Sequence, residues 1–126
     1  MLLTTLVIML ALIQYFVFGL LVGRARGQTG VEAPAVTGHP DFERVFRAHQ
    51  NTLEQLVMFV PAAAACAWFM NDLLAAGLGV VYLIGRTMYF IAYSAEASKR
   101  GAGMGITALA NLGLVISTLV GVFLAF

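Results

Sequence analysis

The strongest constraint on this chain is a run of uncharged, mostly apolar residues near its start, from residue 2 to residue 23. In a helix, roughly 20 such residues cross a bilayer core about 30 Å thick. No basic segment precedes the run and no small-residue cleavage pattern follows it. We therefore interpret it as a retained membrane helix and not as a signal peptide.

Three more apolar stretches of similar length follow, separated by polar breaks. The sequence predicts helices over residues 2–23, 42–70, 73–97 and 103–125. They are joined by a polar loop over 24–41, a short turn at Asn71 and Asp72, and a break from Ser98 to Gly101. No strand pattern or internal repeat interrupts them. The predicted fold class is all-α: an integral membrane four-helix bundle of up-down-up-down topology, forming a single domain over residues 1–126.

The composition excludes several other classes of protein. Hydrophobic residues make up 61% of the chain and charged residues 10%, whereas a soluble domain is nearer half apolar and a quarter charged. A net charge of +1 gives no sign of nucleic-acid binding. The single cysteine, Cys66, excludes an intramolecular disulfide and a cysteine-based zinc site, and we expect no metal.

All basic residues belong to two of the predicted connections or to the helix halves nearest them. They are Arg24, Arg26, Arg44, Arg47, Arg86, Lys99 and Arg100. The positive-inside rule therefore places both connections in the cytoplasm. We expect a multi-pass integral membrane protein with its polar residues on the cytoplasmic side. The compact chain without a retention signal favours a bacterial inner membrane.

Two charged residues are predicted at membrane depth. At 1.5 Å per residue, Glu54 lies about 24 Å and Arg86 about 20 Å from the far membrane surface. Each would cost several kcal/mol if unpaired in hydrocarbon. They need a partner, a cavity or a ligand.

The spacing of the neighbouring polar residues defines two stripes. On the second helix, one face carries Arg47, Asn51 and Glu54. On the third helix and the break after it, the stripe comprises Arg86, Tyr89, Tyr93 and Arg100. Arginine binds carboxylates, glutamate pairs with an ammonium group and asparagine with a peptide group, so the set suits a small zwitterionic peptide. Alternatively, Arg86 and Glu54 form a structural ion pair and the tyrosines are membrane-interface residues.

Two sequence blocks resemble the MAPEG family, the membrane-associated proteins in eicosanoid and glutathione metabolism. Residues 42–54 read FERVFRAHQNTLE, similar to the family signature F-E-R-x-x-R-A-x-x-N-x-x-E. Residues 85–93 read GRTMYFIAY, similar to the family's R-x-x-Y-F-x-x-Y block. The resemblance is strongest to the branch that holds leukotriene-forming synthase and the microsomal glutathione transferases.

The resemblance implies a homotrimer that binds glutathione between neighbouring subunits near the cytoplasmic face. From the matched positions and the polar stripes, the candidate glutathione contacts are Arg26, Arg47, His49, Asn51, Glu54, Arg86, Tyr89 and Tyr93. Arg24 remains an alternative to Arg26. Arg100 matches the arginine credited with activating the glutathione thiol, and is the candidate catalytic residue. Gln55 departs from the synthase pattern, which has tyrosine there, and this argues against a leukotriene-specific enzyme.

The implied function is a membrane-bound glutathione transferase, with glutathione as co-substrate and a lipophilic electrophile arriving from the membrane lipid. An arginine beside the sulfur favours the thiolate, although the nearby carboxyl end of the third helix would oppose it. The same thiolate could reduce lipid hydroperoxides. The alternatives are a non-catalytic lipid-binding or scaffold member of the family, and a drug/proton antiporter. The antiporter is disfavoured because the first helix contains no acidic residue.

Overall fold

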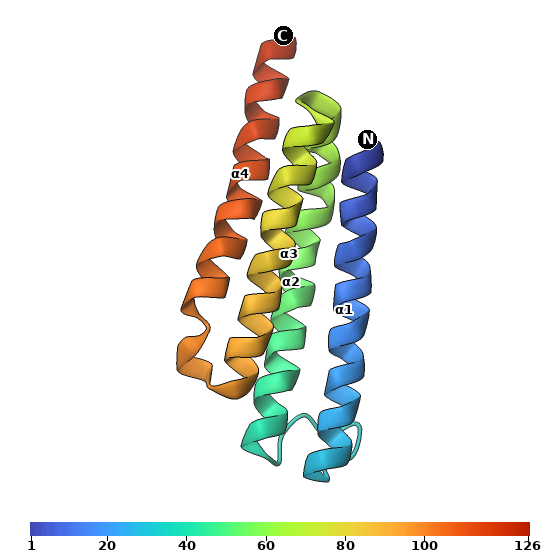
Figure 1. The fold of residues 1–126 in the computed structure, drawn as a ribbon, viewed down its shortest axis with the longest axis vertical. Helices are drawn as coiled ribbons and strands as arrows, with labels where there is room; N and C mark the ends of the chain where they lie inside the picture. Colours follow the sequence, from blue (N-terminus) through green and yellow to red (C-terminus); the bar gives the residue numbers. More distant parts are fainter.

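The computed structural model describes residues 1–126 as four long helices that form one elongated bundle (Figure 1). The helices are α1 (Leu2–Thr29), α2 (Pro40–Phe69), α3 (Asp72–Ala95) and α4 (Gly101–Ala125), with a short 3-10 helix, η1 (Ala97–Lys99), before α4. All four long helices are long and apolar enough to cross a membrane. Both termini and the α2–α3 turn lie at one end, and the other two connections lie at the opposite end. The all-helical, up-down-up-down prediction is confirmed.

Helix α1 is six residues longer than predicted, so that the prediction of a loop starting at residue 24 was wrong. Arg24 and Arg26 lie in its last turns, and the helix ends only at Gly30, whose φ of 77° is left-handed. The Gly30 N–H donates to the Arg26 carbonyl at 2.9 Å. The first arginine was used to predict the end of the helix, but arginine is a good helix former. Glycine, in contrast, readily takes the left-handed conformation that ends a helix.

The other helix ends differ from the prediction by at most two residues. Helix α2 starts at Pro40, and its cap is His39, whose Nδ1 accepts from the Asp41 N–H at 3.1 Å. Helix α3 starts at Asp72 and is capped by Asn71, whose Oδ1 accepts from the Leu74 N–H. It ends at Ala95 instead of residue 97, and α4 starts at Gly101 instead of residue 103.

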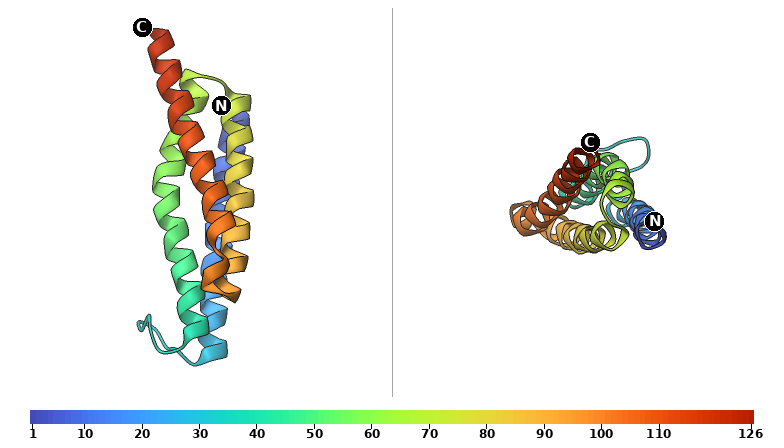
Figure 2. Two further views of the ribbon diagram at one scale, coloured as in Figure 1. Left: turned by 90° about the vertical axis from the view of Figure 1, so that its left-hand side faces the viewer. Right: turned by 90° about the horizontal axis from the view of Figure 1, so that it is seen from above.

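Helices α2 and α3 form the centre of the bundle, and α1 and α4 pack on opposite sides of them (Figure 2). The main core cluster is built from alanines and a few larger side chains, among which the rings of Phe59 and Tyr82 stack with centroids 4.0 Å apart. Large apolar side chains also cover the outside, for example Leu109 and Phe123. Such a surface suits contact with membrane lipid.

Two glycines let α3 and α4 approach closely near the loop end. A Cβ on Gly103 would lie 2.3 Å from the Tyr89 backbone nitrogen, and one on Gly85 would lie 2.9 Å from the Thr107 backbone nitrogen. Small residues at such contacts are typical of packed membrane helices. The close approach brings the start of α4 against the tyrosines of α3.

The end with the termini is closed by hydrogen bonds. The Asp72 carboxylate accepts from the backbone N–H groups of Leu3 and Thr4, both at 3.0 Å, and from the Thr4 hydroxyl at 2.6 Å. The amino group of Met1 lies 3.5 Å from the same carboxylate. Asp72 therefore joins the start of α3 to the otherwise uncapped start of α1.

Candidate functional site

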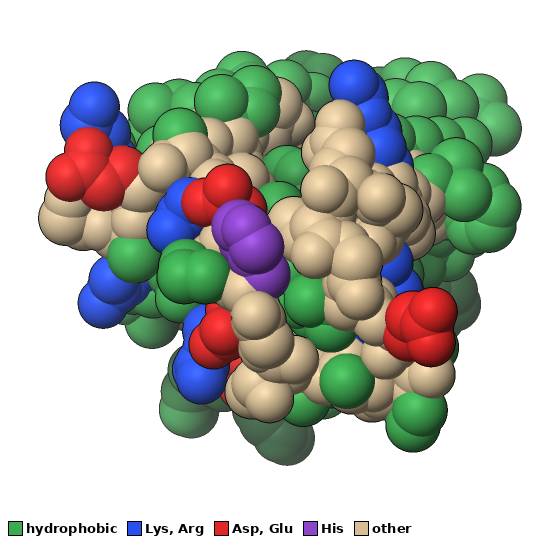
Figure 3. All heavy atoms as spheres, turned by 90° about the horizontal axis from the view of Figure 1, so that it is seen from below, with side chains coloured by type: hydrophobic (Ala, Val, Ile, Leu, Met, Phe, Trp, Pro, Cys, Tyr) green, Lys and Arg blue, Asp and Glu red, His purple; other side chains and the backbone are tan.

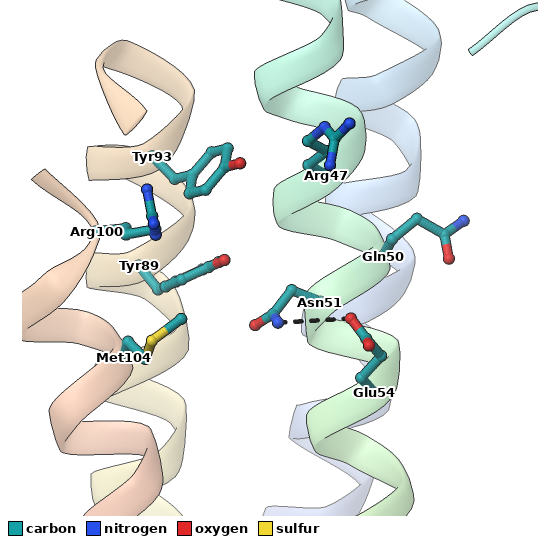
Figure 4. A pocket seen from close by; sticks show the side chains of 8 residues that line it. All are labelled: Arg47, Gln50, Asn51, Glu54, Tyr89, Tyr93, Arg100 and Met104. Atoms are coloured by element: carbon teal, nitrogen blue, oxygen red, sulfur yellow. Dashed lines mark hydrogen bonds between the residues drawn. The ribbon is translucent and has the colours of Figure 1, made fainter. Parts of the chain in front are cut away.

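A polar pocket of about 330 Å³ lies between α2, α3 and α4, in the half of the bundle nearest the loop end. Its volume falls at the low end of the range for ligand sites. Helix α2 supplies one wall, and α3 with the start of α4 supplies the other (Figure 4). The residues that line this polar pocket are Arg47, Gln50, Asn51, Glu54, Tyr89, Tyr93, Arg100 and Met104.

The pocket joins the two stripes that the sequence predicted. Arg47, Asn51 and Glu54 lie along one face of α2, and the rings of Tyr89 and Tyr93 extend from α3 toward them (Figure 4). The exposure differs along the walls: Tyr89 is buried, Asn51 and Tyr93 are half-buried, and the charged side chains are exposed in the single chain. The hydrophobic parts of the tyrosines are packed, and the charged groups are left accessible.

The charges that line the pocket form no ion pair. Arg47, Glu54 and Arg100 each lack an oppositely charged group within 4.0 Å. The ion pairs of the chain join Met1 to Asp72, Arg44 to Asp41, and Lys99 to Glu96. Within the pocket, the Asn51 amide donates a long hydrogen bond of 3.5 Å to Glu54. Groups of both signs are therefore free to interact with another molecule.

Arg86 lies behind the pocket and does not line it. Its side chain is 1% exposed, its Nη1 donates to the Asn51 Oδ1 at 3.1 Å, and its guanidinium lies 4.0 Å from the centre of the Tyr89 ring. No ion pair joins Arg86 to Glu54, so the alternative of a structural pair between them was wrong. Arg86 instead supports two of the pocket residues.

Two other predicted contacts lie outside the pocket of the single chain. The ring of His49 faces α1 and stacks on Tyr15 with centroids 4.4 Å apart. Arg26 donates to the carbonyl groups of Val31 and Ala35, the second at 2.7 Å, and so holds the α1–α2 loop. Arg24 is exposed and forms no ion pair.

Arg100 lies at the start of α4 and not at the end of α3. Helix α3 ends at Ala95, and Arg100 takes the N-cap position of α4 after the η1 turn. Its Nη1 donates to the Ala97 carbonyl at 2.9 Å, and its guanidinium lies 5.6 Å from the Tyr93 ring centre. A second helix end therefore lies beside Arg100: the amino end of α4, whose dipole favours a negative charge, in contrast to the carboxyl end of α3.

Two lining residues, Gln50 and Met104, were not predicted from the sequence. Met104 follows Arg100 by four residues and so shares its face of α4, a signal that could have been used. Gln55, which departs from the synthase pattern, points into the bundle, where its Oε1 accepts from the Asn111 amide at 3.0 Å.

The sequence pattern of the MAPEG family matches residues 4–120. Human microsomal glutathione S-transferase 2 is 46% identical over 99 residues, covering 75% of this chain and 67% of that protein. Leukotriene C4 synthase of Cavia porcellus is 36% identical over 122 residues, covering 90% of this chain and 81% of the synthase. An uncharacterised protein of Synechocystis is 42% identical over 113 residues, covering 90% of this chain and 82% of the relative. The chain therefore belongs to the MAPEG family.

Proposed function

We propose that this protein is a membrane-bound glutathione transferase that joins the glutathione thiolate to lipophilic electrophiles. The observation that carries the proposal is a pocket lined by two arginines and a glutamate, none of which has an ionic partner in the chain. A pocket with free charges of both signs suits a zwitterionic ligand, and Glu54, predicted at membrane depth, is costly there without a partner. Glutathione has two carboxylates and one ammonium group, so it would pair with both the arginines and the glutamate.

The chemistry of each lining group suggests its part in binding. Arg47 would hold a carboxylate, because the guanidinium fork matches its two oxygens. Glu54 would pair with the ammonium group, and Asn51 would bond to a peptide group. The hydroxyls of Tyr89 and Tyr93, extending toward α2, would donate to the remaining acceptors. The family resemblance supports each of these residues as a glutathione contact, and the particular roles rest on the chemistry of the side chains.

Arg100 is the proposed catalytic residue. The thiol would lose its proton to solvent, and the positive guanidinium would stabilise the sulfur anion without giving up a proton of its own. The amino end of α4 would add to this effect. The sulfur would then form a bond to the electrophilic carbon while the leaving group departs with its bonding electrons. The protein mainly places the two reactants and favours the thiolate.

A neighbouring subunit would complete the site. Arg47 and Glu54 are exposed in the single chain, and the family resemblance implies a homotrimer with glutathione between subunits. Such an assembly would cover these charges and could bring in groups that lie outside the pocket of one chain. His49 is one candidate. Arg24 is a better candidate than Arg26, because Arg26 is already bonded to two carbonyl groups of the loop.

The pocket lies in the half of the bundle nearest the loop end, where charged side chains gather (Figure 3). The positive-inside rule supports a cytoplasmic position for this end, and the relative from Synechocystis supports a bacterial membrane. Glutathione would enter from the cytoplasm, and the electrophile would arrive through the membrane lipid.

A transferase assay with glutathione and chlorodinitrobenzene on the purified protein tests the proposal. We expect saturable, glutathione-dependent release of chloride. A parallel assay with a lipid hydroperoxide would show whether the same thiolate also reduces peroxides. A protein that binds lipid but neither binds nor consumes glutathione would be the non-catalytic family member instead.

A further inference from the structure

Three buried residues behind the polar pocket carry polar atoms without hydrogen-bond partners. The atoms are Nε and Nη2 of Arg86, the hydroxyl of Tyr82 and the Oδ1 of Asn111. None of the three residues is more than 1% exposed. A buried polar group without a partner destabilises a fold, and more so where the surroundings are hydrocarbon. These atoms therefore need a hydrogen-bond partner other than one another.

The hydrogen bonds and helix register place the three residues at neighbouring levels of the bundle. Tyr82 precedes Arg86 by four residues and so shares its face of α3. Helix α2 runs antiparallel to α3. Gln55 therefore lies one turn from Asn51 toward the end with the termini, just as Tyr82 lies one turn from Arg86 toward that end. Arg86 is bonded to Asn51 at 3.1 Å, and Asn111 is bonded to Gln55 at 3.0 Å. Tyr82 also stacks on Phe59, one turn beyond Gln55.

The free atoms are complementary in chemistry. The arginine nitrogens only donate, the Asn111 oxygen only accepts, and the tyrosine hydroxyl can do both. No direct bond links them. Internal water satisfies such groups in proteins, because one water molecule can accept from one group and donate to others.

We propose that Tyr82 and Asn111 are positioning residues for the glutathione site. Together with internal water they hold the Arg86 guanidinium, which in turn holds Asn51 by a hydrogen bond and Tyr89 through its ring. Gln55 fixes the Asn111 amide from the other side. This inference rests on the proposed function, since its effect is read at the glutathione pocket.

The first test compares conservative variants of the full chain, purified in lipid nanodiscs. Tyr82→Phe removes the hydroxyl but keeps the ring that stacks on Phe59, and Asn111→Leu removes the amide at similar volume. Thr107→Val is the matched control, because Thr107 is equally buried on α4 and its hydroxyl bonds only to the Gly103 carbonyl of its own helix. We expect both test variants to raise Kd and KM for glutathione about three- to tenfold, as for one lost hydrogen bond. kcat and the control should stay within about twofold.

The second test separates positioning from general loosening of the fold. If Tyr82 acts through Asn51, Tyr82→Phe should have no further effect on Kd in a chain that already carries Asn51→Ala. An equal effect of Tyr82→Phe in both backgrounds would overturn the proposal. So would unchanged affinity in both single variants while the wild-type protein binds glutathione. A wild-type protein that binds no glutathione would instead overturn the proposed function.

A structure at a resolution that shows ordered water tests the network without reference to glutathione. We expect a water within hydrogen-bonding distance of the Tyr82 hydroxyl and the Asn111 Oδ1. Direct bonding among Arg86, Tyr82 and Asn111, with no water between them, would contradict the inference.

Discussion

The polar pocket and the end of the bundle with the termini treat their charged residues in opposite ways. At the end with the termini, the Asp72 carboxylate accepts from two backbone N–H groups and from the Thr4 hydroxyl, and it lies 3.5 Å from the Met1 amino group. At the loop end, Arg47, Glu54 and Arg100 line a pocket without any ion pair.

The difference separates a structural use of charge from a binding use. A charge that is fully paired within the chain holds two helices together and has nothing left to offer a ligand. A charge left unpaired at membrane depth, where Glu54 is predicted to lie, is costly, so it points to a molecule that the single chain does not contain. On this comparison, substitutions of the unpaired charges in the polar pocket should change glutathione chemistry, and substitutions at the end with the termini should change stability.

The largest expected effect is that of Arg100→Ala. Removing the charge that stabilises the thiolate should lower kcat with chlorodinitrobenzene by about 100-fold, with the Kd of glutathione changed by less than about threefold. The matched control is Lys99→Ala, because Lys99 is already paired with Glu96 at 3.5 Å and does not line the pocket. Full activity in Arg100→Ala would refute the catalytic role.

The next effect in size is that of Glu54→Gln. The loss of a carboxylate that pairs with an ammonium group should weaken glutathione binding about 10- to 100-fold. The same change at Glu43, which lies on α2 outside the pocket, should leave the affinity unchanged. Calorimetric titration of both variants gives the comparison, and equal affinities would remove Glu54 from the site.

A smaller effect is expected at the end of α1, where the two arginines differ in their bonding. Arg24→Ala should weaken glutathione binding about three- to tenfold, as for one lost hydrogen bond to a charged group. Arg26→Ala should leave the affinity unchanged, because Arg26 is bonded to the carbonyls of Val31 and Ala35. The reverse result would show that Arg26 leaves the loop carbonyls in the assembled protein.

At the opposite end, Asp72→Ala should have no effect on glutathione affinity. It removes the carboxylate that caps α1 from another helix, and should destabilise the fold by about 1 kcal/mol, as for the loss of a helix cap. A lower thermal midpoint with unchanged Kd is the expected result. A fall in glutathione affinity comparable to that of Glu54→Gln would mean that the two ends do not differ as described.

Much of the fold could be predicted because apolar length decides it. Four runs long enough for the bilayer, separated by polar breaks, leave little choice but a helical bundle. The end of α1 was missed because charge was taken to end the helix, whereas Gly30 ends it through its left-handed φ. The start of α2 was missed because His39 does not belong to the usual capping residues.

The site could be predicted in part, because helical spacing places side chains on a face but does not say which face meets which. The stripes from Arg47 to Glu54 and from Tyr89 to Arg100 do meet in one pocket. The burial of Arg86 behind Asn51, and the turn of His49 toward Tyr15, depend on how the helices rotate against each other. Contacts between helices set these rotations, as the close contact at Gly85 and Gly103 does for α3 and α4, and spacing within one helix carries no information about them.

The central claim is that the unpaired charges at the loop end bind glutathione. Calorimetric titration of glutathione into the purified protein in detergent, with the mass of the protein particle measured alongside, tests it most directly. The account predicts saturable binding to a trimeric particle, and its loss or strong weakening in Glu54→Gln and Arg47→Ala but not in Asp72→Ala. The absence of any saturable heat from the wild-type protein, or binding that is indifferent to both pocket variants, would contradict it.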